Sequence, residues 1–272
     1  MAKRADILLV EAGLAQSRER AKALIMEGVV YYNEQKVNKA SDAFADDAVL
    51  TVRQNPIPFV SRGGLKLKKA VENYDIDIKD RVCVDVGAST GGFTDCMLQN
   101  GARLVYAVDV GYGQLDWRLR SDERVVCLER HNARFMEPEW FAETPVFASC
   151  DVSFISIKLI LPGMFKCLSE GGSAVVLVKP QFEAGRGKVG KNGVVRDASV
   201  HEEVLLECAS YAMECGFKIL AVDHSPITGP KGNIEFLLYL KKNAADEETG
   251  IGSEELPSVV KTVVRAAHDE LD

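Results

Sequence analysis

Three polar side chains stand at the ends of apolar segments in this sequence. Asp151 lies in C-D-V-S-F, Lys179 in V-L-V-K-P-Q-F and Glu235 in G-N-I-E-F-L-L-Y-L. Carboxylates and amines can move protons and stabilise developing charge, although each alone is also explained by a helix cap or a structural ion pair. Ligands bind at the carboxyl ends of strands in open α/β sheets, so the shared placement indicates one site.

A glycine turn follows an earlier apolar segment. Residues 82–96 read V-C-V-D-V-G-A-S-T-G-G-F-T-D-C, which predicts a strand, a tight turn and the start of a helix. Glycine permits positive φ and close approach of a ligand, and the N–H groups of a new helix attract electron-rich atoms. The stretch therefore predicts a nucleotide-like cofactor site. Its expected binding residues are Asp85, Gly87, Ser89, Gly91, Gly92, Phe93 and Thr94.

The glycine turn by itself fits both NAD and S-adenosylmethionine, because both folds add an acid after the second strand. Asp109, which ends L-V-Y-A-V-D, is that acid and would accept hydrogen bonds from a ribose diol. G-A-S-T-G-G lacks the G-x-G-x-x-G spacing, and no Gly-Lys-Ser/Thr closes a phosphate loop. Asp85, just before the first glycine, suits an amine-bearing cofactor better than a pyrophosphate. These residues favour S-adenosylmethionine.

Strand and helix patterns alternate beyond residue 80, as an α/β fold requires. The expected strands are 82–86, 103–110, 125–128, 146–150, 173–179, 217–222 and 235–240, and the expected helices are 94–99, 115–119, 155–168 and 200–215. A further helix begins near Gly64. Seven strands with a final adjacent pair predict the Rossmann-like sheet of a class I methyltransferase.

Composition narrows the kind of protein. The 272 residues are 47% hydrophobic, and no apolar run approaches the ~20 residues of a membrane span. Seven scattered cysteines without C-x-x-C pairs or metal-ligand spacing predict a reduced, cytoplasmic setting and no metal site. The net charge of −7 conceals a basic first 70 residues and an acidic tail, so it does not exclude RNA as a partner.

The first 58 residues read as a small domain. Two short helices are expected at 5–11 and 17–27, the second capped by Ser17, followed by two β segments around Asn33 and Glu34. The segment G-L-A-Q-S-R-E-R-A-K-A-L-I-M-E-G-V-V-Y-Y-N resembles the alpha-L RNA-binding domain of a ribosomal protein, pseudouridine synthases and tyrosyl-tRNA synthetase. That resemblance implies that Arg18, Arg20 and Lys22 contact RNA phosphates.

Nearly the whole chain resembles one enzyme family. The junction reads V-S-R-G-G-L-K-L, and Lys66, Asp151, Lys179 and Glu235 match the Lys-Asp-Lys-Glu tetrad of FtsJ-type RNA ribose 2'-O-methyltransferases. With the alpha-L domain in front, the chain is similar to the TlyA family, ribosomal RNA cytidine 2'-O-methyltransferases often labelled haemolysins. The resemblance implies catalysis by the tetrad, Asn132 beside the adenine where relatives carry an acid, and RNA contact by Arg62. D-V-S-F replaces a more proline-rich segment of these relatives.

The tetrad suits this reaction chemically. A ribose hydroxyl is a poor nucleophile, so a base or cation must take its proton or stabilise the alkoxide. We expect Lys179 to fill that role, with Lys66 as a second positive charge and the two carboxylates as orienting partners. The following segment, E-A-G-R-G-K-V-G-K-N-G-V-V-R-D, reads either as a flexible surface loop or as a mobile basic loop that closes over RNA. Its expected RNA contacts are Arg186, Lys188, Lys191 and Arg196.

The expected domains are an alpha-L domain at 1–58, an FtsJ-like methyltransferase domain at 59–243, and an acidic linker with an amphipathic helix at 244–272. That helix is expected to pack on its own domain rather than on a partner. The leading function is S-adenosylmethionine-dependent methylation of ribosomal RNA, free or in ribosomal subunits. Two alternatives are a haemolysin, which the lack of apolar spans disfavours, and a non-catalytic ribosome-assembly factor, which the tetrad disfavours.

Overall fold

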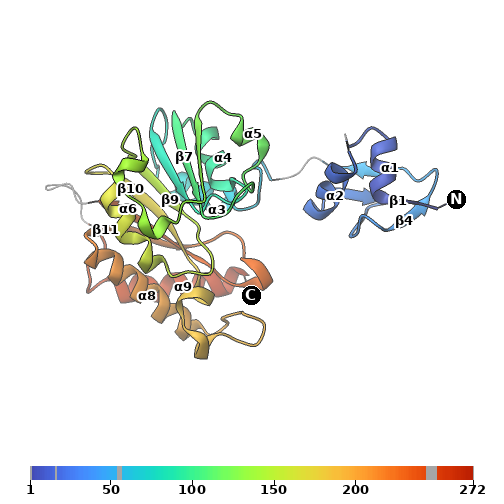
Figure 1. Cartoon of the computed structure of the whole chain (residues 1–272). Helices are drawn as coiled ribbons and strands as arrows, with labels where there is room; N and C mark the ends of the chain where they lie inside the picture. Colours follow the sequence, from blue (N-terminus) through green and yellow to red (C-terminus); the bar gives the residue numbers. More distant parts are fainter. Residues whose placement is uncertain (1, 16, 54–56, 243–249, 272) are drawn as a thin grey trace. The chain divides into compact units, whose positions relative to one another are not determined.

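The structure is a computed structural model that describes residues 2–15, 17–53, 57–242 and 250–271, without the side chains of Glu27 and Arg186. It divides the chain into two compact units, Met1–Pro58 and Phe59–Asp272 (Figure 1). Each unit has its own core, so each is described by itself. Most of the acidic linker expected after residue 243 lies outside the described residues.

The first unit packs two helices on short strands. The elements are β1 (Ala2–Arg4), α1 (Ala5–Glu11), α2 (Arg18–Glu27), β2 (Val30–Tyr32), β3 (Gln35–Lys36), β4 (Ala43–Ala45) and β5 (Thr51–Val52). Ser17 Oγ accepts a hydrogen bond from the backbone N–H of Arg20 at 3.2 Å, which confirms the predicted helix cap. The sequence reading missed β1, β4 and β5, because strands of two or three residues show no readable alternation.

The second unit is built on a seven-stranded sheet. Its strands are β6 (Val82–Val86), β7 (Leu104–Asp109), β8 (Val125–Glu129), β9 (Phe147–Cys150), β10 (Ser173–Val178), β11 (Phe217–His224) and β12 (Phe236–Lys242). Their order is β11-β12-β10-β9-β6-β7-β8, and β12 runs antiparallel to both of its neighbours. The predicted seven-stranded α/β fold is confirmed. Chain order reverses at β6, which pairs with both β7 and β9, and ligands bind at such switch points.

Helices cover both faces of this sheet (Figure 1). They are α3 (Gly64–Asn73), α4 (Gly92–Gln99), α5 (Trp117–Arg120), α6 (Leu161–Cys167), α7 (Pro180–Glu183), α8 (Ala198–Glu214) and α9 (Leu256–Leu271). The short 3₁₀ turns are η1 (Ala133–Phe135), η2 (Pro138–Trp140), η3 (Ile157–Leu159), η4 (Arg186–Lys188) and η5 (Pro230–Gly232). Val84 and Val86 of β6 face a core shared with α6, α8 and α9, and Asp85 between them faces α4. Because successive side chains of a strand point to opposite faces of the sheet, Asp85 lies on the face covered by α4.

One predicted helix is wrong. The segment 155–168 forms η3 and then α6, rather than a single helix. Pro162 occupies the first turn of α6 and has no N–H to continue a hydrogen-bond ladder from the preceding turn. The chain therefore restarts its helix at Leu161.

The C-terminal helix α9 belongs to the second unit. Its apolar stripe, Leu256, Val260, Val264 and Ala267, is buried, and the helix packs on α8 and β11 as expected. A hydrogen bond of 3.0 Å between His201 Nδ1 and His268 Nε2 joins α8 to α9. Among the described residues, no helix has the length and apolar character needed to cross a membrane.

Candidate active site

Four charged side chains meet at the carboxyl edge of the sheet in the second unit. Lys66 Nζ donates to Glu235 Oε2 at 2.6 Å and lies 3.6 Å from Asp151 Oδ2. Lys179 Nζ forms an ion pair with Asp151 Oδ1. The structure therefore brings together all four residues of the predicted tetrad, in the alternating order Lys179–Asp151–Lys66–Glu235.

Strand register places three members of the tetrad. Val178 of β10 pairs with Phe236 of β12, so Lys179 and Glu235 stand at the same level where the two strands meet the edge. Asp151 follows Cys150, the last residue of β9, which pairs with β10. Residues from three neighbouring strands thus reach one point of the edge.

A close backbone contact places Lys66. A side chain on Gly64 would lie 2.8 Å from the carbonyl oxygen of Gly92, and one on Gly92 would lie 2.9 Å from the amide nitrogen of Gly64. Only glycine at both positions lets the start of α3 lie against the start of α4. The R-G-G-L-K segment therefore brings Lys66, on the first turn of α3, to the strand edge.

The tetrad is buried and its charges are balanced. The side chains of Lys66 and Lys179 are 8% and 9% exposed, that of Glu235 is fully buried, and that of Asp151 is 21% exposed. A buried ion costs several kcal/mol unless a partner compensates it, and here each ion contacts an opposite charge. Asp151, the most exposed member, lines a cleft from which a substrate could reach Lys179.

Asp85 lies beneath the glycine turn. Its Oδ2 accepts hydrogen bonds from the Thr94 N–H at 2.8 Å and the Thr94 hydroxyl at 2.7 Å, and its Oδ1 accepts one from Ser149 Oγ at 3.0 Å. Burial raises the pKa of Asp85 to about 6, although the hydrogen bonds from Thr94 and Ser149 lower it. Because the carboxylate is 0% exposed, the structure places Asp85 where it anchors the turn and the start of α4.

An open cleft of about 500 Å³ begins above that turn. Asp109 lies on its wall, where Oδ2 accepts from the Ser89 N–H and Oδ1 from the Gly111 N–H, both at 2.7 Å. Gly87 has φ +84, and a side chain there would lie 2.6 Å from the carbonyl oxygen of Asp151. Asn132 also lines the cleft. Gly91, Gly92, Phe93 and Thr94 are buried in or behind the turn.

A smaller cleft of about 160 Å³ adjoins the first one. The two share Gly87, Ser89, Asp151 and Ser153 in their walls, and the smaller one also includes Lys179. A molecule in the large cleft and one in the small cleft would therefore meet beside Lys179. This arrangement suits transfer of a group between two bound molecules.

Three residues near the tetrad went unassigned in the sequence reading. Ser153 Oγ accepts a hydrogen bond from Lys179 Nζ at 2.9 Å, and Gln181 Nε2 donates to Glu235 Oε1 at 3.4 Å. Phe154 lines the large cleft, is 90% exposed and has φ +64. All three lie two or three residues after Asp151 or Lys179, in D-V-S-F and K-P-Q-F, and this closeness in sequence could have identified them as neighbours of the site.

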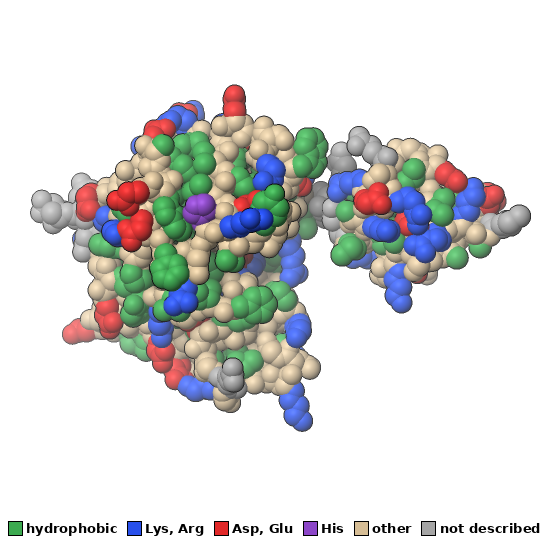
Figure 2. All heavy atoms as spheres, viewed as in Figure 1, with side chains coloured by type: hydrophobic (Ala, Val, Ile, Leu, Met, Phe, Trp, Pro, Cys, Tyr) green, Lys and Arg blue, Asp and Glu red, His purple; other side chains and the backbone are tan. Residues whose placement is uncertain are grey.

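The predicted RNA contacts of the first unit lie on α2. Arg18, Arg20 and Lys22 are exposed, whereas Ala21, Leu24 and Ile25 face the core. Arg18 Nη2 donates to Asp6 Oδ2 at 2.9 Å, so this guanidinium is held in place by a carboxylate. Hydrogen bonds from Arg4 and then Arg18 lower the pKa of Asp6 to about 2. Figure 2 shows Lys and Arg side chains gathered on one face of this unit.

The basic loop that follows Lys179 is tied at its far end. Asn233 is buried, accepts a hydrogen bond from the Val195 N–H at 3.1 Å and donates to Gly193 O at 3.0 Å. Lys191 and Arg196 are exposed, Lys188 pairs with Glu203, and the side chain of Arg186 lies outside the described residues. Arg62 is exposed just before α3. Asn233 thus joins the basic loop to the turn that carries Glu235.

Comparison with protein families finds two matches. Residues 59–242 match the FtsJ-like methyltransferase family, and residues 3–45 match the S4 domain, the family also called alpha-L. The first match covers most of the chain and includes all four tetrad residues.

Individual relatives extend over both units. YqxC of Bacillus subtilis is 51% identical over 99% of this chain and 95% of its own length. TlyA of Mycobacterium tuberculosis, named a 16S/23S rRNA (cytidine-2'-O)-methyltransferase, is 45% identical over 89% of this chain and 91% of its own length. A solved structure of a hemolysin-labelled protein from Streptococcus thermophilus is 47% identical, with a TM-score of 0.77 over 99% of this chain and 96% of that one.

Proposed function

The chain belongs to the FtsJ-like methyltransferase family, and we propose that it transfers a methyl group from S-adenosylmethionine to the ribose 2'-hydroxyl of a cytidine in ribosomal RNA. The observation that carries the proposal is the buried Lys179–Asp151–Lys66–Glu235 array beside two adjoining clefts. The 2'-hydroxyl and the cytidine are proposed from the similarity to TlyA of Mycobacterium tuberculosis.

The large cleft fits S-adenosylmethionine. Its volume of about 500 Å³ lies in the ordinary range for cofactor pockets, about 300–1,000 Å³. Asp109 would accept the ribose hydroxyls, because a carboxylate oxygen accepts more than one hydrogen bond. Val110, Val152 and Ile155 offer apolar walls for an adenine, and Asn132 offers a polar contact. The bound cofactor supplies a methyl group on a positively charged sulfur.

The tetrad acts on the ribose hydroxyl. Lys179 reaches the small cleft. There its ammonium form stabilises the negative charge on the oxygen as the new O–C bond forms, or its neutral amine form takes the hydroxyl proton. Ser153 and Asp151 orient that amine, and Lys66 and Glu235 hold Asp151 from the other side. Every side chain in the array is restrained by a partner, so little reorganisation is required during transfer.

The first unit binds the RNA in this proposal. The S4 match and the exposed basic residues Arg18, Arg20 and Lys22 support this role. Contacts to phosphates give affinity and position, and they carry little sequence information. The substrate would be ribosomal RNA or a ribosomal subunit in the cytoplasm.

The proposal is tested by incubating the protein with methyl-labelled S-adenosylmethionine and either ribosomal subunits or protein-free ribosomal RNA. Label should appear in RNA, resist alkaline cleavage as a 2'-O-methyl group does, and map to cytidine. Lys179→Ala should lower the rate of transfer by about 100-fold or more, while calorimetry shows unchanged cofactor binding. Label on a base instead of a ribose, or full transfer by Lys179→Ala, contradicts the mechanism.

A further inference from the structure

The exposed large apolar side chains of the second unit come from one stretch of its sequence. Among the described residues, they fall between the end of β7 and η3: Val110, Tyr112, Trp117, Val126, Phe135, Phe154 and Leu159. The other half of the unit, β10 to β12 with α8 and α9, exposes none in its described part. Val110 and Phe154 of this set line the large cleft, and exposed apolar surface beside a cleft indicates an interaction site.

An arginine side chain lies over each of two of these aromatic rings. The guanidinium carbon of Arg130 lies 4.3 Å from the ring centre of Tyr112, and that of Arg134 lies 5.7 Å from the ring centre of Phe135. Both distances are within the ~6 Å range of a cation–π contact. As whole residues, Tyr112 and Phe135 are 69% and 65% exposed. We name these four residues the stacked-arginine rim.

The rim has positive charge that no carboxylate of the described residues pairs with. Neighbouring arginines are neutralised, since Arg118 pairs with Asp116, Arg120 with Glu129 and Arg124 with Asp122. Arg130 and Arg134 have no such ion pair in the part of the chain that the structure describes. Their guanidinium groups are therefore available to an anion.

The backbone fixes the rim to the wall of the large cleft. Arg130 has φ +57, a left-handed conformation uncommon for a residue with a side chain. Its N–H donates to Gly111 O at 3.1 Å, and the next N–H, of His131, donates to Asp109 O at 3.0 Å. These bonds hold Arg130 beside the segment that carries Tyr112. Arg134 itself lines the cleft.

We propose that the stacked-arginine rim binds unpaired nucleotides of the RNA substrate next to the methylated residue. The inference rests on the proposed function and adds a contact surface separate from α2 and the basic loop. Exposed aromatic faces stack on bases, and an arginine fork stacks on rings and bonds to phosphate oxygens. A protein partner would leave these two cations without a matching charge unless it brought carboxylates, whereas RNA brings phosphates at every nucleotide.

The charge of the rim is tested with the double variant Arg130→Ala/Arg134→Ala in the full-length protein. Its KM for ribosomal RNA should rise about tenfold, because a stacked base contributes about 1–3 kcal/mol and a tenfold change corresponds to about 1.4 kcal/mol. The kcat should change less than about twofold, since the tetrad is untouched. Arg130 is not among the described residues that line the large cleft, so Arg130→Ala alone should change the dissociation constant for S-adenosylmethionine less than about twofold while still raising the KM for RNA. The salt dependence of RNA binding should lose about 1.4 from its log–log slope, about 0.7 for each lost phosphate contact.

The matched control is Arg103→Ala/Arg124→Ala. It removes the same charge, but both arginines are already paired, Arg103 with Glu143 and Arg124 with Asp122. The ring is tested separately with Tyr112→Phe, which should behave as wild type, and Tyr112→Leu, which should raise the KM for RNA. A KM equal in the double variant and its control overturns the inference.

The experiments distinguish an error in the proposed role of the rim from an error in the proposed function. If the wild-type protein transfers no methyl group to RNA, the proposed function fails, and the rim is then judged by direct RNA binding of the same variants. Equal RNA affinity of the double variant and its control overturns the rim in that case. A loss seen on intact subunits but absent on protein-free RNA shows contact with a ribosomal protein and also overturns it.

Discussion

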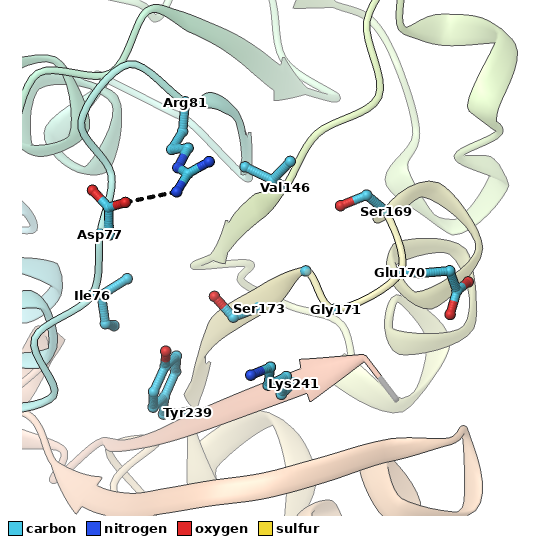
Figure 3. Close-up of a pocket in the computed structure, with 11 residues that line it drawn as sticks. Ile76, Asp77, Arg81, Val146, Ser169, Glu170, Gly171, Ser173, Tyr239 and Lys241 are labelled. Carbon is cyan, nitrogen blue, oxygen red and sulfur yellow. Dashed lines mark hydrogen bonds and ion pairs between the residues drawn. The ribbon is translucent and has the colours of Figure 1, made fainter. Parts of the chain in front are cut away.

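The two ends of the same sheet carry clefts of similar size and different chemistry. At the amino end, Ile76, Val146, Ser173 and Tyr239 help to line a cleft of about 420 Å³ (Figure 3). The larger cleft at the carboxyl end measures about 500 Å³ and adjoins the tetrad. Cleft volume therefore does not distinguish the two ends.

Burial of charge does distinguish them. At the amino end, Asp77 and Arg81 form a 2.8 Å ion pair with side chains that are 63% and 50% exposed (Figure 3). Such surface pairs contribute little, and water screens them. At the carboxyl end, Lys66 and Glu235 are held at 2.6 Å with almost no exposure. Among the described charged residues that line the two clefts, Lys179 at the carboxyl end is buried, whereas those at the amino end are not. Because a protein must compensate buried ions, this difference indicates where chemistry takes place.

The largest effect on kcat is expected from removing Lys179 at the carboxyl end of the sheet, compared with removing Arg81 at the amino end. Lys179→Ala should lower kcat for RNA methylation by about 100- to 10,000-fold, the usual contribution of a positioned proton-transfer group. Arg81→Ala, the matched change at the amino end, should alter kcat less than about twofold because its ion pair is solvent-exposed. Single-turnover kinetics measures both. Similar losses for the two variants would contradict the assignment of the carboxyl end.

Asp85 at the carboxyl end of the sheet and Asp77 at the amino end should contribute to the free energy of unfolding with opposite dependence on pH. Burial raises the pKa of Asp85 to about 6, so its favourable contribution exists at low pH and is lost as pH rises through about 6. The rise from the ordinary 3.8 corresponds to about 3 kcal/mol at about 1.4 kcal/mol per pH unit. A hydrogen bond from Arg81 lowers the pKa of Asp77, so its contribution is present at neutral pH and is lost on acidification.

Urea unfolding of Asp85→Asn from pH 4 to 8 tests this contrast. The amide retains an oxygen for the Thr94 donors and presents an N–H to Ser149 Oγ. Asp85→Asn should therefore gain stability over wild type as pH rises from about 4 to about 6. Asp77→Asn should be less stable than wild type by a constant amount from pH 4 to 8, because the contribution of Asp77 is lost only below its ordinary pKa of 3.8. A constant difference between Asp85→Asn and wild type across that range would show that Asp85 does not titrate there.

A methyl group beside Glu235 should disturb the tetrad without removing any of its members. In Gly229→Ala the new carbon would lie 2.1 Å from Glu235 Oε1, and Gly229 has an ordinary negative φ of −71. Glu235 must shift from Lys66, which should lower kcat about tenfold, or about 1.4 kcal/mol. Gly187→Ala, with no atom within 4 Å of the new carbon, is the control. Equal kcat values would mean that the position of Glu235 is not critical.

The smallest effect is expected in the basic loop. Lys191→Ala/Arg196→Ala should weaken RNA binding a few-fold and reduce its salt dependence, because both side chains are exposed and have no ion pair in the described part of the loop. Lys188→Ala should have less effect, since Lys188 pairs with Glu203. Fluorescence anisotropy with labelled RNA measures the change. A stronger effect from Lys188 than from the other two would contradict this order.

Sequence patterns predicted the architecture well where segments are long. Alternating apolar segments identified all seven strands of the sheet, and the apolar spacing of 256–271 identified α9. Patterns failed for β1, β4 and β5, which are too short to show a period, and for 155–168, where Pro162 interrupts the helix. Helix ends and turns depend on residues close together in the sequence, such as the capping Ser17 and the helix-starting Pro162, so the sequence alone carries the signals for them.

The amino-acid sequence shows which residues carry charge at the ends of strands, and the family resemblance added Lys66. How these residues pair depends on the folded chain, because strand register and the contact of Gly64 with Gly92 set which carboxylate oxygen meets which amine. It also turned Asp85 away from the cleft, toward Thr94 and Ser149. Residue type follows from the chain, whereas burial and orientation depend on neighbours distant in sequence, and these decide whether a charge anchors a turn or faces a substrate.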